Sequence, residues 1–250
     1  MSDLRTELIL ATSFLTRLPL PDVAYSDEAM ARATRLYPVV GLGIGLALAL
    51  VLWALAALFP QPVAVLLTLA IGIRLTGALH EDGLADTGDG LGGGWTREQA
   101  LEIMRDSRIG TYGALALGLT LAIKATALSF LPLGWATAAL IAGHALGRVA
   151  ILRVIATLAY ARPQGAGDFL DRTRPDPGPV PWVVAALTGL LLGLWIGLWP
   201  AFVALAAAWA GMAAMRRRTR VKLDGYTGDT LGATEQTVET LVPLALLLCL

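Results

Sequence analysis

The sequence predicts an all-α fold, a polytopic integral membrane helical bundle with about six to seven transmembrane helices. Composition is the first reason, since 56% of the 250 residues are hydrophobic, 15% are charged and the mean hydropathy is +0.66. Such a chain is too apolar for an ordinary soluble domain and too long for a single membrane anchor. The second reason is a series of long apolar runs, and the third is the confinement of most charge to a few segments between them. We expect residues 1–250 to form one transmembrane domain.

Seven apolar runs predict the helices in order along the chain. They lie at 38–59, 61–79, 111–132, 135–160, 181–199, 201–215 and 238–250. Most of them approach the length of about 20 residues that a helix needs to cross a hydrocarbon layer. The first six runs predict six spans, whereas the last run is short and leaves a seventh span open. In front of these runs, apolar residues recur at helical spacing between Leu4 and Leu15 and predict an amphipathic segment rather than a span.

The connections between the runs alternate in character. The turns at 60–62, at 131–134 and at Pro200 are short and uncharged, whereas most charged residues fall within 1–37, 80–110, 162–180 and 216–237. If each uncharged turn closes a helical hairpin, the four charged segments lie on one face of the bilayer. Arginine-rich loops remain on the cytoplasmic side, so the basic cluster from Arg216 to Lys222 assigns this face to the cytoplasm.

The most informative charged segment runs from His80 to Gly90. It holds four carboxylates within nine residues, at Glu81, Asp82, Asp86 and Asp89. Like charges this close raise one another's pKa or require a cation, and Mg²⁺ prefers carboxylate oxygens as ligands. If the segment is helical, Asp82, Asp86 and Asp89 lie at i, i+4 and i+7 on one face. The segment therefore predicts a divalent-metal site, against the simpler alternative of a solvated charged loop.

A short helix is predicted from Leu101 to Gly110, after the three glycines at 92–94 that follow the acidic segment. Glu102 and Asp106 stand one helical turn apart and could complete the cation shell, although a solvated helix face is an equal alternative for Glu102. Arg108 could balance the charge of a phosphate group. These residues extend the predicted metal site toward an anionic substrate.

Basic residues also occur inside the apolar runs. His144 and Arg148 are one helical turn apart in the run 135–160, and Arg153 follows in the same run. Lys124 lies in the run 111–132. A basic side chain at the bilayer centre costs about 2.5–3.5 kcal/mol on insertion scales, so it normally has a partner or a water-filled cavity. We expect Arg148 to anchor an anionic group, either a substrate phosphate or an acidic side chain in a structural ion pair. Lys124 and Arg153 are expected to snorkel toward the membrane surface.

A third polar segment lies near the end of the sequence, between Asp224 and Glu235. Its glycines Gly228 and Gly232 flank Asp229 and precede a predicted helix, an arrangement that can present backbone N–H groups to a phosphate. By itself the pattern has little specificity. The loop at 160–168 is less specific still and would, alone, be interpreted as a linker.

Taken together, these segments resemble the signature of the cobalamin synthase family. The main resemblance lies in TGALHEDGLADTGDG at 76–90 and EIMRDSRIGTYG at 102–113. Shorter segments also resemble the family: FLTRLP at 14–19, YARPQGAG at 160–167 and TGDTLGA at 227–233. The ordered series covers most of the chain and is therefore highly specific. Glu81 departs from the family pattern, where an uncharged or apolar residue often precedes the Asp-Gly pair, so it is a less secure ligand than Asp82, Asp86 or Asp89.

The resemblance implies a bacterial inner-membrane enzyme, an adenosylcobinamide-GDP ribazoletransferase that uses Mg²⁺. Such an enzyme transfers the phosphocobinamide group of adenosylcobinamide-GDP to α-ribazole or α-ribazole 5′-phosphate and releases GMP. The resemblance also implies that residues 1–250 are a single transmembrane catalytic domain whose active site faces the cytoplasm. The expected partners are these substrates and the lipid bilayer, without nucleic acid, and association with other cobalamin-assembly enzymes or with further copies of the chain is an open expectation.

Specific residues receive roles under this resemblance. Asp82, Asp86 and Asp89 are expected to hold Mg²⁺, and Asp106 is expected either to add a ligand or to accept the proton of the attacking hydroxyl group. The candidates for phosphate contacts are Arg108, Arg148 and Arg162. Gly228, Asp229 and Gly232 are expected to close the site from the C-terminal side.

Two other functions share part of this pattern. A CDP-alcohol phosphotransferase also places Asp-Gly motifs at a membrane face, but its motif has one more spacer residue and an arginine that the segment from Asp82 to Asp86 lacks. A membrane transporter could use Lys124, His144 and Arg148 along a polar path. Transporters concentrate functional polarity near the bilayer midplane, whereas this chain concentrates it in loops.

Overall fold

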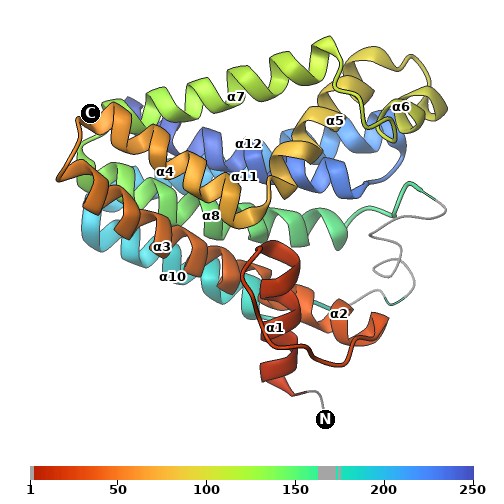
Figure 1. Cartoon of the computed structure of the whole chain (residues 1–250), viewed down its shortest axis with the longest axis horizontal. Helices are drawn as coiled ribbons and strands as arrows, with labels where there is room; N and C mark the ends of the chain where they lie inside the picture. The colour runs from red at the N-terminus through yellow and green to blue at the C-terminus, as the bar shows by residue number, and fades with distance from the viewer. Residues whose placement is uncertain (1–2, 163–172, 174–175) are drawn as a thin grey trace.

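The structure is a computed structural model that describes residues 3–162, 173 and 176–250. Within these residues the regular elements are helices, and the single β contact is an isolated bridge between Tyr160 and Tyr226. The helices are α1 (Leu4–Leu15), α2 (Asp27–Ala33), α3 (Tyr37–Ala56), α4 (Gln61–Thr76), α5 (Leu79–Gly93), α6 (Arg97–Ile103), α7 (Thr111–Phe130), α8 (Leu133–Ile155), α10 (Val180–Ile196), α11 (Leu198–Leu223) and α12 (Gly228–Leu246), with short 3₁₀ turns at Thr34–Leu36 and Leu247–Cys249. The predicted all-α membrane bundle is confirmed (Figure 1).

The number of membrane spans differs from the expected six to seven. By length and composition, four helical stretches can cross a membrane: Asp27–Ala56, Thr111–Phe130, Leu133–Ile155 and Leu198–Leu223. A fifth is counted if α4 and α5 form one broken span, bent by 91°. The bend arises at Gly77 and Ala78, which take left-handed backbone conformations with φ of 66° and 59°. The apolar run 61–79 therefore ends in a sharp turn, and the expected count is not confirmed.

One end of the bundle gathers the uncharged turns and is called the neutral end. The Gln61 side-chain amide donates to the carbonyl oxygens of Leu128 and Leu131, at 2.9 and 2.7 Å, and so joins the α3–α4 turn to the α7–α8 turn. This end lies at the left of Figure 1, together with the C-terminus. The two uncharged turns therefore close helical hairpins on the same side, as the sequence predicts.

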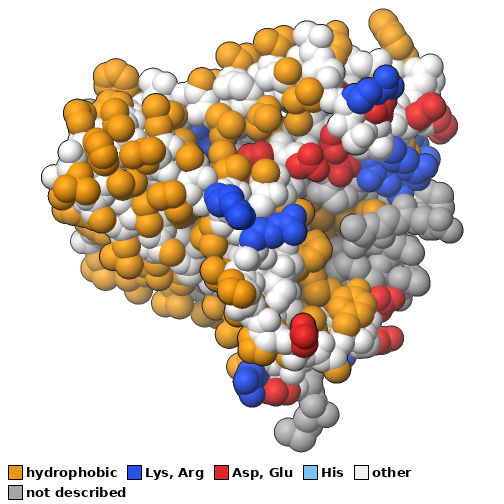
Figure 2. Space-filling model, viewed as in Figure 1, with side chains coloured by type: hydrophobic (Ala, Val, Ile, Leu, Met, Phe, Trp, Pro, Cys, Tyr) orange, Lys and Arg blue, Asp and Glu red, His pale blue; other side chains and the backbone are white. Residues whose placement is uncertain are grey.

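The opposite end, called the charged end, holds the polar segments. Arg97 donates to the carbonyl oxygens of Ala161 and Leu223, at 2.7 Å in each case, so segments separated by more than 60 residues meet there. Figure 2 shows hydrophobic side chains over the surface around the neutral end, while most of the carboxylates visible in this view lie toward the charged end and over α1 and α2. Exposed apolar side chains such as Leu50, Leu119 and Trp199 are typical of a lipid-facing surface.

Helix α8 forms the centre of the bundle and is buried along most of its length. It packs closely against α3, because α3 presents glycines where the two backbones meet. A Cβ atom on Gly45 would lie 2.8 Å from the Cα atom of Ile141 and 3.1 Å from its carbonyl oxygen. Small residues at such contacts allow the close helix packing on which membrane bundles depend.

This contact can be tested with a matched pair of variants on α3. We expect Gly45→Val to destabilise the protein by about 1–3 kcal/mol, because the added atoms meet backbone that cannot move aside. The measurement is thermal unfolding in detergent. Gly43→Val is the control, since Gly43 is exposed on the same helix and its Cβ would meet nothing within 4 Å. Equal unfolding midpoints for the two variants would contradict the proposed packing.

Candidate active site at the charged end

The acidic segment is helical, as one interpretation of the sequence required. Helix α5 runs from Leu79 to Gly93 and begins directly after the left-handed turn. Asp82 is exposed and Asp86, one turn later, is half-buried, whereas Asp89 is buried. The three carboxylates that were predicted to share a face therefore differ in their access to solvent.

A further carboxylate, that of Asp229, approaches Asp82 and Asp86 from α12. Asp229 lies in the first turn of α12, and this turn is fixed by a capping box in which Thr227 and Thr230 exchange hydrogen bonds. The turn sits directly against α5, because a Cβ atom on Gly83 would lie 2.8 Å from the carbonyl oxygen of Asp229. The glycine at position 83 thus allows Asp229 to approach Asp82 and Asp86.

The three carboxylates are called the acidic triad (Asp82, Asp86 and Asp229), and the charges of two of them act on the third. Helix α5 is not one of the four helices that can span a membrane alone. Burial, followed by the negative charges of Asp229 and Asp82, raises the pKa of Asp86 to about 6. Burial also raises the pKa of Asp229, although Arg162 opposes this shift. The mutual repulsion of the triad would be relieved by a cation.

Arg162 borders the triad. Its Nη2 atom donates to Asp229 Oδ2 at 2.6 Å, while its buried Nε–H has no acceptor in the described part of the chain. A buried donor without an acceptor is costly, so this group is suited to an anion such as phosphate. The predicted central loop continues from Pro163 to Gly167, which lies outside the described residues.

Asp89 holds the start of α7. Its Oδ2 and Oδ1 atoms accept hydrogen bonds from the backbone N–H groups of Gly110 and Gly113, at 2.7 and 2.8 Å. These N–H groups lie at a helix N-terminus, where a negative charge is favourable. Asp89 thereby caps α7 from another helix, a structural role that the sequence spacing did not reveal. Its role as a metal ligand stays a prediction.

Asp106 and Arg108 lie in the loop between α6 and α7, because the helix expected from Leu101 to Gly110 ends at Ile103. The two side chains form an ion pair at 2.6 Å, and the hydrogen bonds from Arg108 lower the pKa of Asp106 to about 2. Among the described residues, the structure gives Asp106 no side-chain partner other than Arg108. Their catalytic and metal-binding roles stay predictions.

The two glycines predicted to contact phosphate occupy different environments. Gly228 begins α12 and is exposed, and a Cβ atom there would meet nothing within 4 Å. Gly232, one turn later, packs against α5, since its Cβ atom would lie 3.1 Å from the Cα atom of His80. Gly228 therefore leaves open space beside Asp229, whereas Gly232 serves the contact between α5 and α12.

A network of buried charges lies deeper in the bundle. Arg148 is fully buried and pairs with Glu235 and with Glu239, the latter at 2.7 Å. Lys124 donates to Glu239 at 3.0 Å and to Gln236 at 2.7 Å. Arg148 therefore forms ion pairs with acidic side chains, which was one of the two interpretations of its sequence position. The expectation that Lys124 snorkels is wrong, since its side chain finds these partners within the bundle, whereas Arg153 is exposed.

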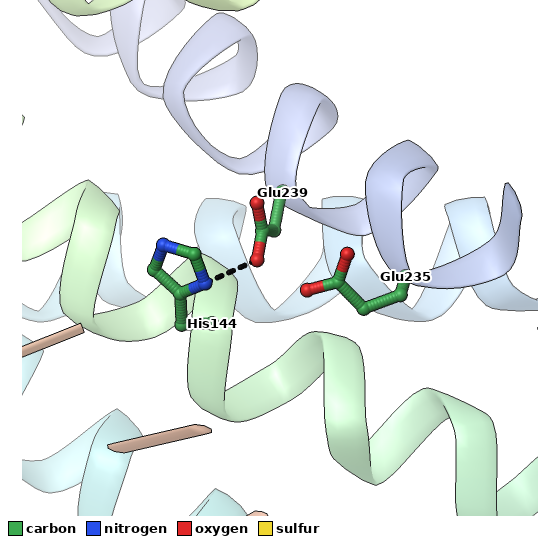
Figure 3. Close-up of side chains that lie close together, drawn as sticks. All are labelled: His144, Glu235 and Glu239. Carbon is green, nitrogen blue, oxygen red and sulfur yellow. Dashed lines mark ion pairs between the residues drawn. The ribbon is translucent and has the colours of Figure 1, made fainter. Parts of the chain in front are cut away.

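The same network contains a group of potential metal ligands. Figure 3 shows His144 of α8 facing Glu239 of α12, with Glu235 one turn away, and the ligand atoms of these three residues lie within 4.8 Å of one another. Arg148 and Lys124 already neutralise the two glutamates. We therefore interpret the group as part of an ion-pair network. In the sequence, Glu235 and Glu239 are one helical turn apart, and so are His144 and Arg148. This matching spacing of acidic and basic residues could have indicated the network.

Comparison with known proteins places these features in a family. A family model described as "Cobalamin-5-phosphate synthase" matches residues 7–247. A protein of Shewanella frigidimarina is 40% identical over 245 residues, covering 95% of this chain and 92% of the relative. A protein of Rhizobium johnstonii is 42% identical over 258 residues, covering 98% of both chains. Both relatives carry the name adenosylcobinamide-GDP ribazoletransferase, and no solved structure matches this chain.

The buried network leads to a prediction about stability. Replacing Arg148 with Leu leaves Glu235 and Glu239 short of a positive charge, and breaking a buried ion pair in this way costs about 3–5 kcal/mol. We expect Arg148→Leu to lower the unfolding midpoint in detergent strongly. Arg153→Leu, on the exposed side of the same helix, should change stability by less than about 0.5 kcal/mol. Similar effects of the two substitutions would refute the structural role of the network.

Proposed function

Because the chain belongs to the cobalamin-5-phosphate synthase family, we propose that it is an adenosylcobinamide-GDP ribazoletransferase that depends on Mg²⁺. In this reaction a ribose hydroxyl oxygen of α-ribazole, or of α-ribazole 5′-phosphate, forms a bond to the phosphorus atom that carries the cobinamide group. The bond from that phosphorus to the oxygen of GMP breaks, GMP leaves, and the hydroxyl proton passes to a base. The product is adenosylcobalamin or its 5′-phosphate.

The convergence of the acidic triad at the charged end is the observation that supports this proposal most. Asp82 and Asp86 come from α5 and Asp229 comes from α12, and the resemblance to the family covers both helices. Their oxygens suit a divalent cation, and the pKa of Asp86, raised by burial and then by the negative charges of Asp229 and Asp82, includes a contribution that such a cation would neutralise. The donor set of the triad therefore fits Mg²⁺.

We propose that Asp82, Asp86 and Asp229 hold Mg²⁺ together with the pyrophosphate of the substrate. When bound, Mg²⁺ supplies charge neutralisation at the phosphoryl oxygens and at the leaving GMP. Arg162 positions Asp229 through its Nη2 atom and offers its free Nε–H to a phosphate oxygen. A carboxylate near the acceptor hydroxyl group takes its proton. Asp106 is a candidate for this step and Arg108 for a phosphate contact, whereas Arg148 is already held by Glu235 and Glu239 and serves the structure instead.

The surface of the protein supports a location in a bilayer. Apolar helices that can span a membrane connect the neutral end with the charged end, where the basic residues of α11 and the acidic triad lie. Basic segments are retained on the cytoplasmic side. We propose that the chain is a multi-pass protein of the bacterial inner membrane and that residues 1–250 form one catalytic domain with its active site on the cytoplasmic side.

The metal assignment gives a prediction for substitutions in the triad. We expect Asp82→Asn and Asp86→Asn each to lower turnover at least about 100-fold, because each removes a charged ligand of the metal and of the transition state. Both proteins should remain folded in detergent and bind Mn²⁺ more weakly than the wild type. The measurements are the rate of GMP release and a Mn²⁺ titration followed by electron paramagnetic resonance.

Glu98→Gln is the control for these variants. Glu98 is an exposed carboxylate of α6 whose ion-pair partner is Arg97, at 4.0 Å. Because an exposed ion pair contributes little to stability, this variant should keep its activity within about twofold of the wild type. Full activity of both Asp variants in the presence of Mg²⁺ would refute the metal assignment.

The transfer reaction itself predicts dependence on the acceptor. GMP should appear from adenosylcobinamide-GDP only when α-ribazole or its 5′-phosphate is present, since the acceptor hydroxyl oxygen is the attacking group. The measurement is GMP quantified by chromatography with and without the acceptor. Release at the same rate without an acceptor would identify a hydrolase instead, and removal of Mg²⁺ by a chelator should abolish release in either case.

A further inference from the structure

A cavity of about 160 Å³ opens beside the acidic triad and differs from it in character. Its polar lining consists of Asp82, Asp229 and the imidazole of His80, and Gly228 lies beside them. The other walls are formed mainly by apolar or aromatic side chains of α1, α3, α5 and α8: Phe14, Leu15, Tyr37, Leu79, Ile151 and Ile155. The cavity therefore joins a hydrophobic interior to two of the proposed metal ligands.

We propose that this cavity, called the base pocket, binds the aromatic base of the acceptor nucleoside. The inference rests on the proposed function and adds to it the binding site of one substrate. The base of α-ribazole is dimethylbenzimidazole, a flat bicyclic ring system that carries two methyl groups. Such a base needs apolar walls and few hydrogen-bond partners, and the base pocket provides this combination.

The size of the pocket supports this choice of ligand. A dry cavity of about 150 Å³ holds one benzene molecule, so a cavity of similar volume with an open side can admit a ring system of one to two rings. The corrin macrocycle of the other substrate is several times larger. The base pocket is therefore too small for the corrin and suits a small aromatic base.

The chemistry of the walls also separates the acceptor base from guanine. Guanine carries several donors and acceptors on its ring edge, and each one that is buried without a partner costs about 1–3 kcal/mol. Leu15, Leu79 and Ile151 offer no hydrogen-bonding side-chain atoms, and the Nδ1 atom of His80 is directed to Arg148 and Glu235 in the buried network. Phe14 and Tyr37 contribute a stacked ring pair, with centroids 5.7 Å apart and planes at 5°. These walls favour a weakly polar aromatic base.

The position of the pocket suits the reaction geometry. Because Asp82 and Asp229 share the lining of the pocket with the apolar side chains, a nucleoside whose base contacts those side chains has its ribose within reach of the two carboxylates. This arrangement would bring a ribose hydroxyl group to the carboxylates and to the pyrophosphate that the metal holds. Such positioning of the attacking group is a major source of rate acceleration. The base pocket thus orders the acceptor relative to the triad.

A pocket-filling variant tests the assignment. Leu79 begins α5 and is partly exposed, so Leu79→Trp adds volume inside the pocket at a position that tolerates change. We expect equilibrium dialysis of α-ribazole with the detergent-purified protein to show about tenfold weaker binding. The KM for α-ribazole should rise by a similar factor, whereas the KM for adenosylcobinamide-GDP should remain unchanged. Leu119→Trp, on the exposed surface of α7, is the matched control and should bind as the wild type does.

A pocket-enlarging variant gives a second test if Leu79→Trp fails to fold. Ile155→Ala removes three carbon atoms from the wall and should shift acceptor preference toward a ribonucleoside with a larger, tricyclic base. Unchanged binding in a folded Leu79→Trp protein, or unchanged preference in Ile155→Ala, would overturn the assignment. A lipid acyl chain that co-purifies with the wild type and is lost from Leu79→Trp, with α-ribazole binding unaltered, would also overturn it.

The outcomes separate this inference from the proposed function. If the wild type releases no GMP with any acceptor, the proposed function fails. If the wild type turns over normally and Leu79→Trp raises the KM of neither substrate, or of both equally, only the base pocket is refuted.

Discussion

The need to neutralise Arg148 inside the bundle is the constraint on which the rest of the structure depends. Its guanidinium group is fully buried and is held by two glutamates of α12, while Lys124 of α7 shares one of them. An unpaired charge in this position would be strongly unfavourable, so α12 has little freedom to slide or rotate relative to α8. Gln236 of α12 extends the network to Glu81 of α5, at 3.0 Å. Four helices are thereby fixed in register around one arginine.

This register determines where the acidic triad forms. Helix α5 directs His80 and Glu81 toward the buried network, while Asp82 and Asp86 are more accessible to solvent. Because α12 is held by Glu235 and Glu239, its first turn must lie against Gly83, and Asp229 arrives beside the two aspartates of α5. The proposed metal site and the base pocket both lie at this crossing. The buried ion pairs thus act as the structural support of the site, separate from its chemistry.

Much of this architecture could be predicted from the sequence. Hydropathy predicted the helical membrane bundle, uncharged turns predicted one shared end, and the motif series predicted the family. The span count could not be obtained in this way, because the left-handed residues Gly77 and Ala78 bend an apolar run that looks continuous. The pairing of side chains on distant helices could not be predicted from the sequence either. Periodicity shows which residues share a face but not which helix they meet, so the partners of Lys124 and the capping of α7 by Asp89 emerged only from the structure.

The structure contains two groups of potential metal ligands, the acidic triad and the group of His144, Glu235 and Glu239. Locating one bound ion would decide between them. The most direct measurement is an experimental structure of the protein with Mn²⁺ and adenosylcobinamide-GDP, in which anomalous scattering marks the metal. We expect the Mn²⁺ peak beside Asp82, Asp86 and Asp229 at the charged end, in contact with the pyrophosphate. A peak between His144, Glu235 and Glu239, with the triad empty, would contradict it.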